Sequence, residues 1–250
     1  MGTYFGGVNY FNPEYEIYTR YSYSSNEKQG LSNPVVGRTI EDKNGNLWIG
    51  TEGGGLNYFN RRTREFKWYR PQEGRNSISH NNVKALYYDA DKEIIWIGTH
   101  LGGLNRLDIR SGHFTHYRME DNNRQTLPSD IVRDIIPYKD LLIVATQNGV
   151  CLFDPDSGKC RQLFKDSKEG KSIKMVADIL LDSEGTLWIA ATGECVFNYR
   201  FDTRKLTNYR HDSANPNSLS NNNVNNIMQD SQGPVSYTHL RAHETLSDLV

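Results

Sequence analysis

Short apolar segments that end in small residues recur along the chain at a nearly constant spacing. Three of them are alike, and a fourth, weaker copy lies between the second and third: Leu47–Thr51, Ile95–Thr99, Leu187–Ala191 and, as the weaker copy, Leu142–Thr146. Successive copies are 45 to 48 residues apart, and Gly2-Thr3 extends the series toward the start of the chain. A fixed period of this length indicates one supersecondary unit per repeat.

One period reads as four short strands. Residues 83–117 show this most clearly, with expected strands at Val83–Asp89, Ile94–Thr99, Leu104–Asp108 and His113–Tyr117. The second strand has apolar residues on both faces, as expected for a sheet covered on both sides. Four antiparallel strands in about 47 residues is the period of a propeller blade, and helical spacing is absent. The sequence therefore predicts an all-β fold, a β-propeller of four-stranded antiparallel blades.

A tryptophan stands at the same place in three of the repeats, at Trp48, Trp96 and Trp188. We expect each indole to fill the gap between adjacent blades. The Gly or Ala two residues later lies on the same face of the strand, where it leaves room for a side chain of the neighbouring blade. These positions are interpreted as structural, not functional.

Composition and charge narrow the function only by exclusion. Lys and Arg number 29 against 30 Asp and Glu, and no long run of one sign occurs. A role at nucleic acid or at a membrane surface therefore gains no support. The 15 Tyr, 9 Phe, 4 Trp and 21 Gly suit strands and tight turns.

The three cysteines, Cys151, Cys160 and Cys195, match neither a disulfide framework nor a zinc motif. Cys151 and Cys160 fall on adjacent strands of one expected hairpin. If the turn at Pro155–Gly158 sets the register, Cys160 faces Phe153, and a bridge to Cys151 would need a slipped ladder. We therefore expect free thiols.

The repeat resembles a known family. Asn46–Phe59, which reads NLWIGTEGGGLNYF, closely resembles the two-component regulator propeller repeat, and Leu219–Val224 is similar to the segment that opens each such blade. The resemblance runs from Gly2 to about Gly233. The chain departs from the family pattern where Ala145 and Ala190 replace Gly, and where Cys195-Val196 stands in place of Gly-Leu.

The resemblance implies a role that composition does not show. Proteins with this repeat are typically bacterial hybrid two-component sensors, whose propellers form a periplasmic ligand-binding region ahead of a membrane span, a histidine kinase and a DNA-binding output. Their ligands are often oligosaccharides or monosaccharides released during glycan breakdown, and they signal as dimers. A ring of this family has about seven blades.

The repeats give an expected division of the chain. Blade repeats are expected near residues 1–30, 31–77, 78–126, 127–172 and 173–218, with a truncated repeat at 219–234. Met1 stands where other repeats have the middle of a second strand. After Gly233 the pattern stops, and Val235–Val250 resembles translated sequencing adapter, so we interpret 235–250 as a non-native tail. The expected propeller is incomplete, with about four to five blades of a seven-bladed ring.

No group of residues has the spacing of a catalytic centre. Asp and Glu recur mainly in turns, as at Glu41-Asp42, Asp89-Ala90-Asp91 and Asp182-Ser183-Glu184, where short acceptors satisfy local backbone N–H groups. We therefore expect this segment not to be an enzyme, and we expect no catalytic residues, no metal and no cofactor.

A binding face is easier to place. In this strand order the loops from second to third strands and from fourth to first strands share one face. Directly after each apolar segment, that face carries Tyr4, Glu52, His100, Gln147 and, allowing for slippage, Glu194. An aromatic ring with hydrogen-bonding groups would suit a sugar. The alternative is that these varied residues merely tolerate solvent.

The preferred hypothesis is a non-catalytic, periplasmic sensor segment that binds a glycan-derived small molecule and regulates transcription through kinase and regulator domains outside this sequence. The full-length protein would be a histidine kinase and a homodimer, anchored in the membrane through a downstream segment, and this segment would contact no nucleic acid. Two alternatives remain, a propeller enzyme that acts on polysaccharide as a lyase or hydrolase, and a protein-interaction scaffold.

Overall fold

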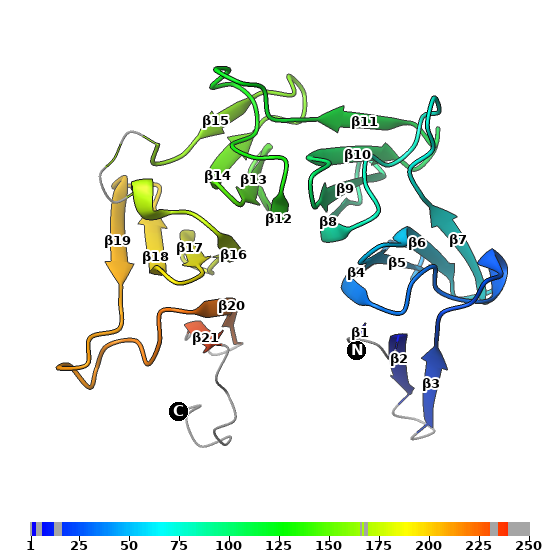
Figure 1. Ribbon diagram of the computed structural model, residues 1–250, viewed down its shortest axis with the longest axis horizontal. Coiled ribbons are helices and arrows are strands. Elements are labelled where there is room, and N and C mark those ends of the chain that lie inside the picture. Colours follow the sequence, from blue (N-terminus) through cyan, green and yellow to red (C-terminus); the bar gives the residue numbers. More distant parts are fainter. Residues whose placement is uncertain are drawn as a thin grey trace. The chain divides into compact units, whose positions relative to one another are not determined.

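The computed structural model describes residues 2–3, 7–12, 17–165, 167, 170–230 and 235–239 (Figure 1). The chain divides into two compact units. Unit 1 comprises Met1–Arg118 and Asp130–Val132, and unit 2 comprises Met119–Ser129 and Arg133–Val250. In the described part of the chain every regular element is a strand, apart from the two short 3₁₀ turns η1 (Glu27–Gln29) and η2 (Gly170–Ser172).

Unit 1 contains three sheets whose neighbouring strands are consecutive in sequence and antiparallel. The first has three strands, β1 (Gly2–Thr3), β2 (Gly7–Asn12) and β3 (Ile17–Tyr21). The second has β4 (Val36–Glu41), β5 (Leu47–Thr51), β6 (Gly55–Asn60) and β7 (Glu65–Tyr69). The third has β8 (Val83–Asp89), β9 (Ile94–Thr99), β10 (Leu104–Asp108) and β11 (Phe114–Tyr117).

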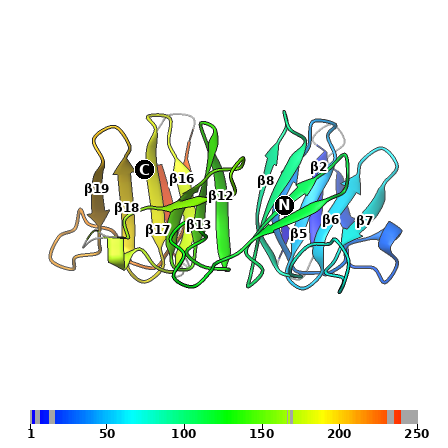
Figure 2. The same cartoon turned by 90° about the horizontal axis from the view of Figure 1, so that it is seen from above.

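Unit 2 repeats this meander. Its first sheet has β12 (Val132–Tyr138), β13 (Leu141–Thr146), β14 (Gly149–Phe153) and β15 (Cys160–Gln162). Its second has β16 (Val176–Leu181), β17 (Thr186–Ala191), β18 (Cys195–Arg200) and β19 (Lys205–Tyr209). A two-stranded sheet of β20 (Val224–Gln229) and β21 (Val235–His239) follows. Within each unit the sheets stand face to face (Figure 2).

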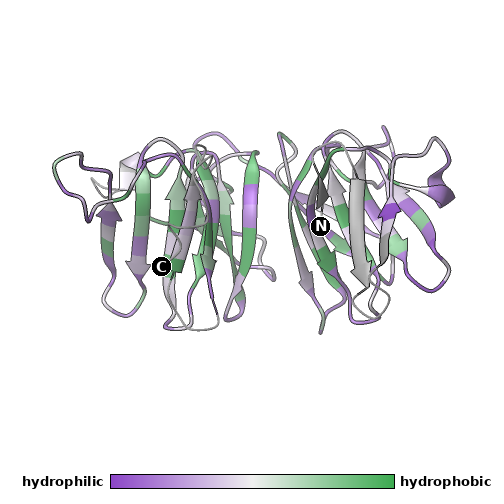
Figure 3. Ribbon diagram, turned by 90° about the horizontal axis from the view of Figure 1, so that it is seen from below, coloured by the Kyte–Doolittle hydropathy of each residue, from purple (hydrophilic) through white to green (hydrophobic). Residues whose placement is uncertain are grey.

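The predicted fold class is confirmed. β8, β9 and β10 have the bounds that the apolar pattern predicts, and β11 begins one residue later than expected, at Phe114. The second strand β9 is buried along its whole length, which explains why both of its faces are apolar. In Figure 3 the hydrophobic residues lie mainly on strands, whereas many connecting turns are hydrophilic.

The interface between two blades of unit 1 is built around Trp48. Its side chain is 2% exposed and packs in one hydrophobic cluster with residues of its own blade and of the blade β8–β11, among them Leu56, Val83 and Ile97. Gly50 lies at the same interface, where an added Cβ would come within 2.7 Å of Val83 Cγ1. The predicted roles of the tryptophan and of the small residue are therefore confirmed at this interface.

The other two tryptophans differ in burial. Trp96 is 1% exposed, and its ring centroid lies 6.0 Å from that of Tyr117. Trp188 is only half-buried, and it packs against a small cluster between the blade β16–β19 and the two-stranded sheet, which contains Ala190, Val224 and Ile227. Trp188 therefore does occupy a gap between sheets, but the gap is incompletely covered.

The β4–β5 hairpin is held by the side chain of Asp42. Its Oδ1 accepts hydrogen bonds from the backbone N–H groups of Asn44 (2.9 Å) and Asn46 (3.0 Å), and its Oδ2 accepts one from Trp48 Nε1 (3.3 Å). The acid thus fixes both the turn and the orientation of the indole. This confirms the interpretation of Asp42 as a turn residue.

The β16–β17 hairpin repeats this arrangement. Oδ1 of Asp182 accepts from the backbone N–H groups of Glu184 (3.0 Å) and Thr186 (2.8 Å), and Oδ2 accepts from Trp188 Nε1 (2.7 Å). The spacing Asp-x-x-Gly-x-x-Trp is therefore a structural motif, in which one carboxylate serves two backbone donors and one indole.

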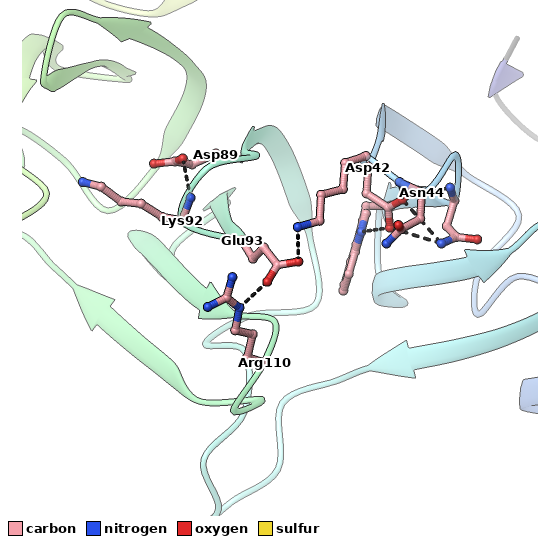
Figure 4. Close-up of polar contacts among 9 residues, drawn as sticks. Asp42, Asn44, Asp89, Lys92, Glu93 and Arg110 are labelled. Carbon is pink, nitrogen blue, oxygen red and sulfur yellow. Dashed lines mark hydrogen bonds and ion pairs between the residues drawn. The ribbon is translucent and has the colours of Figure 1, made fainter.

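Ion pairs tie neighbouring hairpins of unit 1 together (Figure 4). Lys43 Nζ in the β4–β5 turn lies 2.6 Å from Glu93 Oε1 in the β8–β9 turn, and Arg110 pairs with the other oxygen of Glu93. These two cationic partners, Lys43 first, lower the pKa of the Glu93 carboxyl. Glu93 has a positive φ of 53°, and 19% of its side chain remains exposed.

One further strand lies where the repeat pattern of the sequence ends. Val235–His239, which we assigned to a non-native tail, forms β21 and pairs with β20 from Gln229 to Val224. The physical reason is that Val235, Tyr237 and Thr238 have high β propensity, so this segment can occupy the place of a second strand without the Leu-Trp-Ile-Gly-Thr sequence. Residues 240–250 lie outside the described residues.

Candidate functional site

Within unit 1, the two kinds of loop that define the predicted binding face meet. The connection that leads from β7 into β8 lies against the β5–β6 loop, because the carbonyl oxygen of Asn81 accepts hydrogen bonds from the N–H groups of Gly53 (3.2 Å) and Gly55 (2.7 Å). The loop from second to third strands and the connection from fourth to first strands therefore meet at one face, as the strand order requires.

The structure brings the expected site residues Glu52 and His100 to one segment of this face. Glu52 forms an isolated antiparallel bridge with Asn82, and the carbonyl oxygen of Asn82 accepts a hydrogen bond from His100 N (2.9 Å). Glu52 Oε1 also lies 2.5 Å from Lys84 Nζ, with side chains 39% and 23% exposed, respectively. Two blades thus present a polar cluster of Glu52, Asn82, Lys84 and His100.

His80 joins this cluster, although sequence reasoning missed it. Its ring centroid lies 6.4 Å from that of His100, and its Nδ1 accepts a hydrogen bond from Asn82 N (3.1 Å). Burial and then the nearby Arg118 lower the pKa of His80, which favours the neutral ring. The available signal was its place in the segment that opens the β8–β11 blade, two residues before Asn82.

In unit 2 the equivalent backbone pattern centres on Met175. Its N–H donates to the carbonyl oxygen of Gln147 (2.7 Å), and its own carbonyl accepts from Thr192 N (3.1 Å). Because the Thr192 bond matches the bond from His100 to Asn82, Thr192 and not Glu194 is equivalent to His100. Glu194 lies two residues later, where it pairs with Arg210 at 3.3 Å. Both of these side chains are nearly half exposed, so water screens the pair.

The five expected site residues are therefore distributed as follows. Glu52 and His100 lie in one cluster of unit 1, and Gln147 and Glu194 lie on separate loops of unit 2. Tyr4 lies outside the described residues. The role of this aromatic member of the expected sugar site stays a prediction.

A groove of about 670 Å³ lies within unit 2, next to Gln147. Leu127, Val150 and Ile173 form its buried floor, each at most 2% exposed. Four segments contribute its walls: residues 119–128, 148–150, 162–165 and 170–174. An apolar floor with polar walls in this size range is typical of small-molecule sites.

The walls of this groove carry hydrogen-bonding groups of both kinds. Arg124, Lys165 and Lys174 can donate, Glu120 and Asp121 can accept, and the amides of residues such as Asn148 can do both. Sequence reasoning missed the groove because one wall is the connection between β11 and β12, whereas the expected site residues all follow second strands. Asn148 was the one signal, since it directly follows the expected site residue Gln147.

Within the residue ranges that the structure describes, no group of three or more His, Cys, Asp or Glu side chains is arranged to hold a metal ion. Across the same ranges, no helix is long and apolar enough to cross a membrane. What the geometry offers is a set of hydrogen-bonding surfaces suited to binding.

Comparison with known proteins identifies the repeat. The family described as two component regulator propeller matches residues 30–53 and 77–100. Each of these two stretches runs through a second strand into the loop that follows it, and the stretches include Glu52 and His100. No curated protein matches the chain in sequence.

Solved structures share the fold. The chain is similar to the extracellular domains of the hybrid two-component systems BT3049 (TM-score 0.68, 20% identity) and BT4673 (TM-score 0.72, 21% identity) of B. thetaiotaomicron. The two alignments include 93% and 95% of this chain, but only 36% and 29% of the BT3049 and BT4673 domains, respectively.

A more distant structure is PorZ, a surface component of the type-IX secretion system of Porphyromonas gingivalis, with a TM-score of 0.55 and 17% identity over 79% of this chain and 30% of PorZ. The chain thus spans about a third of the length of these proteins. It shares the fold of these β-propeller domains, and two of its stretches, residues 30–53 and 77–100, match the two-component regulator propeller model.

Proposed function

We propose that this chain is a ligand-sensing segment of a two-component signalling protein and that its ligand is a glycan-derived oligosaccharide or monosaccharide. The observation that carries the proposal is the pair of two-component regulator propeller repeats, at residues 30–53 and 77–100. The fold likeness to extracellular domains of hybrid two-component systems supports the same role.

The geometry supports binding rather than catalysis. The groove of unit 2 has a buried apolar floor and polar walls, and the cluster around Asn82 in unit 1 has paired hydrogen-bond donors and acceptors. Saccharide hydroxyls need such pairs, and the apolar faces of a sugar ring can lie on an aliphatic floor. We propose the groove as the first candidate site and the cluster of unit 1 as the second.

The same proposal includes the cellular location of the segment and the signalling domains of the full-length protein. We infer a periplasmic location, in which the segment is connected to the membrane by a span outside this sequence. The full-length protein is then a histidine kinase that signals as a homodimer and regulates transcription. These statements rest on the family and on the extracellular domains with the same fold.

Titration calorimetry of the full chain with a panel of neutral and acidic oligosaccharides tests the proposal. We expect heat of binding from at least one saccharide, with the saccharide recovered unchanged. Cleavage of a saccharide would favour a polysaccharide-degrading propeller, and silence across the whole panel would favour a protein-interaction scaffold. Either result would contradict the sensor role.

Variants assign the site. Asn148→Ala combined with Lys174→Ala changes the walls of the groove, Glu52→Gln combined with His100→Asn changes the cluster of unit 1, and Lys205→Ala is a matched control on the exposed start of β19. We expect the groove variant to weaken binding at least tenfold, which corresponds to about 1.4 kcal/mol. Equal affinities for all three variants would exclude both candidate sites.

A further inference from the structure

Two thiols in unit 2 lie closer together than their ladder positions suggest. In the pairing of β14 with β15, Cys160 stands opposite Phe153, as predicted, and Cys151 stands opposite Gln162. The two cysteines are therefore diagonal neighbours. Their sulfur atoms are nevertheless 3.3 Å apart, with Cys151 donating to Cys160. In the structure both are free thiols, and the twist of the strands brings this diagonal pair of side chains into contact.

We propose that Cys151 and Cys160 are a site of covalent cross-linking and form a disulfide in an oxidising compartment. The inference rests on the periplasmic location in the proposed function, since disulfides form and persist there and not in a reducing cytosol. The co-reactant is a disulfide, either of a small molecule or of an oxidoreductase. The Cys160 thiolate attacks one of its sulfurs and releases the first thiol, and the Cys151 thiolate then attacks Cys160 Sγ and releases the second. Two cysteine thiols are oxidised, and one disulfide is reduced to two thiols.

The order of the two attacks follows from access. A small hollow of about 240 Å³ is lined by Cys160 together with Leu152, Lys159 and Arg161, and Cys160 is 5% exposed whereas Cys151 is 0% exposed, so a co-reactant would approach Cys160 first. Cys151 is fully buried, and its contact with Cys160 and its burial raise the pKa of its thiol. Cys151 therefore suits the second, intramolecular attack, where proximity compensates for a low thiolate fraction.

The outer strand of this blade is also the one that most needs a cross-link. β15 has three residues, whereas β7 and β19 have five and β11 has four. Outside the ladder, Cys160 N donates to Gln125 O (2.7 Å), and Gln162 Nε2 donates to Thr126 O (3.4 Å). A bond from Cys160 to β14 would fix a strand that the ladder alone holds weakly.

The cross-link would also fix one wall of the groove. Val150 precedes Cys151 and forms part of the groove floor, and Leu163 donates from its backbone N–H to the Val150 carbonyl (2.8 Å) while lining the same groove. The two cysteines therefore lie directly behind residues that line the first candidate site.

Thiol counting after oxidation tests the cross-link. The full chain is incubated with oxidised glutathione or with a reductant, denatured, and titrated for free thiols. We expect three thiols in the reduced chain and one in the oxidised chain, since Cys195 is buried on β18 as the third cysteine. Peptide mapping without reductant should join the peptides of Cys151 and Cys160, and the intact mass should fall by two hydrogen atoms. Three titratable thiols after oxidation, or a bond that includes Cys195, would overturn the proposal.

Variants separate the cross-link from general effects on folding. Cys195→Ser is the matched control and should still lose two thiols on oxidation, whereas Cys151→Ser and Cys160→Ser should lose none within the chain. The urea midpoint of the oxidised wild type should exceed that of the reduced form, and this difference should vanish in Cys160→Ser. Equal midpoints in the wild type would contradict a structural role for the bond. Because this readout uses no saccharide, a chain that binds no sugar but forms the bond would refute only the proposed function.

Discussion

The hairpins that contain Trp48 and Trp188 have the same sequence motif, the same turn and the same carboxylate-to-indole hydrogen bond, yet the two indoles differ in burial. Trp48 is 2% exposed, whereas Trp188 is half-buried. Trp48 faces the four-stranded sheet β8–β11 and shares a cluster with Ile78, Val83 and Phe114 of that side. Trp188 faces a sheet of two strands, β20 and β21.

This difference shows that the orientation and the burial of the indole have separate causes. The aspartate and the turn set the orientation of the indole within its own blade, and they do so equally in both hairpins. The next sheet decides how much of the indole leaves water. Stability contributed by the tryptophan position is therefore a property of neighbouring blades together and not of one repeat, as expected for a stacked array.

The largest expected effect is the loss of an indole. Trp48→Ala should lower the free energy of unfolding by about 3–5 kcal/mol, because a large cavity is left in a closed cluster. Trp188→Ala should cost less, about 1–3 kcal/mol, because part of its surface is already in water. Urea denaturation followed by circular dichroism measures both, and a cost at Trp188 equal to that at Trp48 would break the comparison.

A smaller effect is expected from one added methyl group. Gly50→Ala should cost about 1–3 kcal/mol, because the new Cβ would lie 2.7 Å from Val83 Cγ1 and Val83 would have to move. The equivalent residue Ala190 already packs its methyl group in the cluster with Val224, so that site tolerates what Gly50 does not.

The control for this steric explanation is a compensating change. Val83→Ala should cost stability alone but should reduce the penalty of Gly50→Ala, since it removes the atoms that the new Cβ meets. A Gly50→Ala penalty that is unchanged in the Val83→Ala background would mean that the clash is not its cause.

The aspartates of the two hairpins should respond differently to an amide. Asp42→Ala and Asp182→Ala should each cost about 1–2 kcal/mol, because two backbone donors and one indole donor lose their acceptor. Asn keeps an acceptor for the backbone but directs an amide N–H at the indole. The indole bond is 2.7 Å at Asp182 and 3.3 Å at Asp42, so Asp182→Asn should cost more than Asp42→Asn in the same denaturation assay. The reverse order would show that the turn, not the indole, dominates.

Much of the fold could be predicted because the same strand pattern recurs in several copies along the chain. Apolar runs on both faces identify second strands. Gly50 indicates that a side chain of the neighbouring blade packs against it, and in the structure this side chain is Val83. The strand β21 could not be predicted, because its sequence lacks the motif and its place is set by pairing with β20. Likewise, the Cys151–Cys160 contact depends on the twist of the strands, which the pairing register inferred from the sequence does not include.

Less of the candidate site could be predicted. The register argument placed Glu52 and His100 on one face, because backbone pairing at Asn82 follows from the strand order. In the copy after Ala191, Thr192 and not Glu194 is the residue that directly follows the second strand, so the position equivalent to His100 carries no acid there. The groove was not predicted, because its wall at residues 119–128 is a connection between strands β11 and β12, whereas the expected site residues all follow second strands.

The smallest effect concerns the ion pairs that join hairpins in the better-covered blade interface. Lys43 and Arg110 lower the pKa of Glu93 below its ordinary value of 4.5. A carboxyl whose pKa is lower in the folded protein stabilises the fold fully above the ordinary pKa, and this stabilisation is lost as the pH falls through the lowered pKa. Urea midpoints of the wild type should therefore fall between neutral pH and pH values below 4.5 by more than those of Glu93→Gln.

Glu73→Gln, at an exposed glutamate of the connection between β7 and β8, is the matched control and should keep the pH dependence of the wild type. Added salt should shrink the difference between wild type and Glu93→Gln, because Glu93 and its partners are in part accessible to ions. Identical pH profiles for wild type and Glu93→Gln would mean that Lys43 joins the hairpins without stabilising them. The interfaces of Trp48 and Trp188 would then differ only in the apolar surface that they cover.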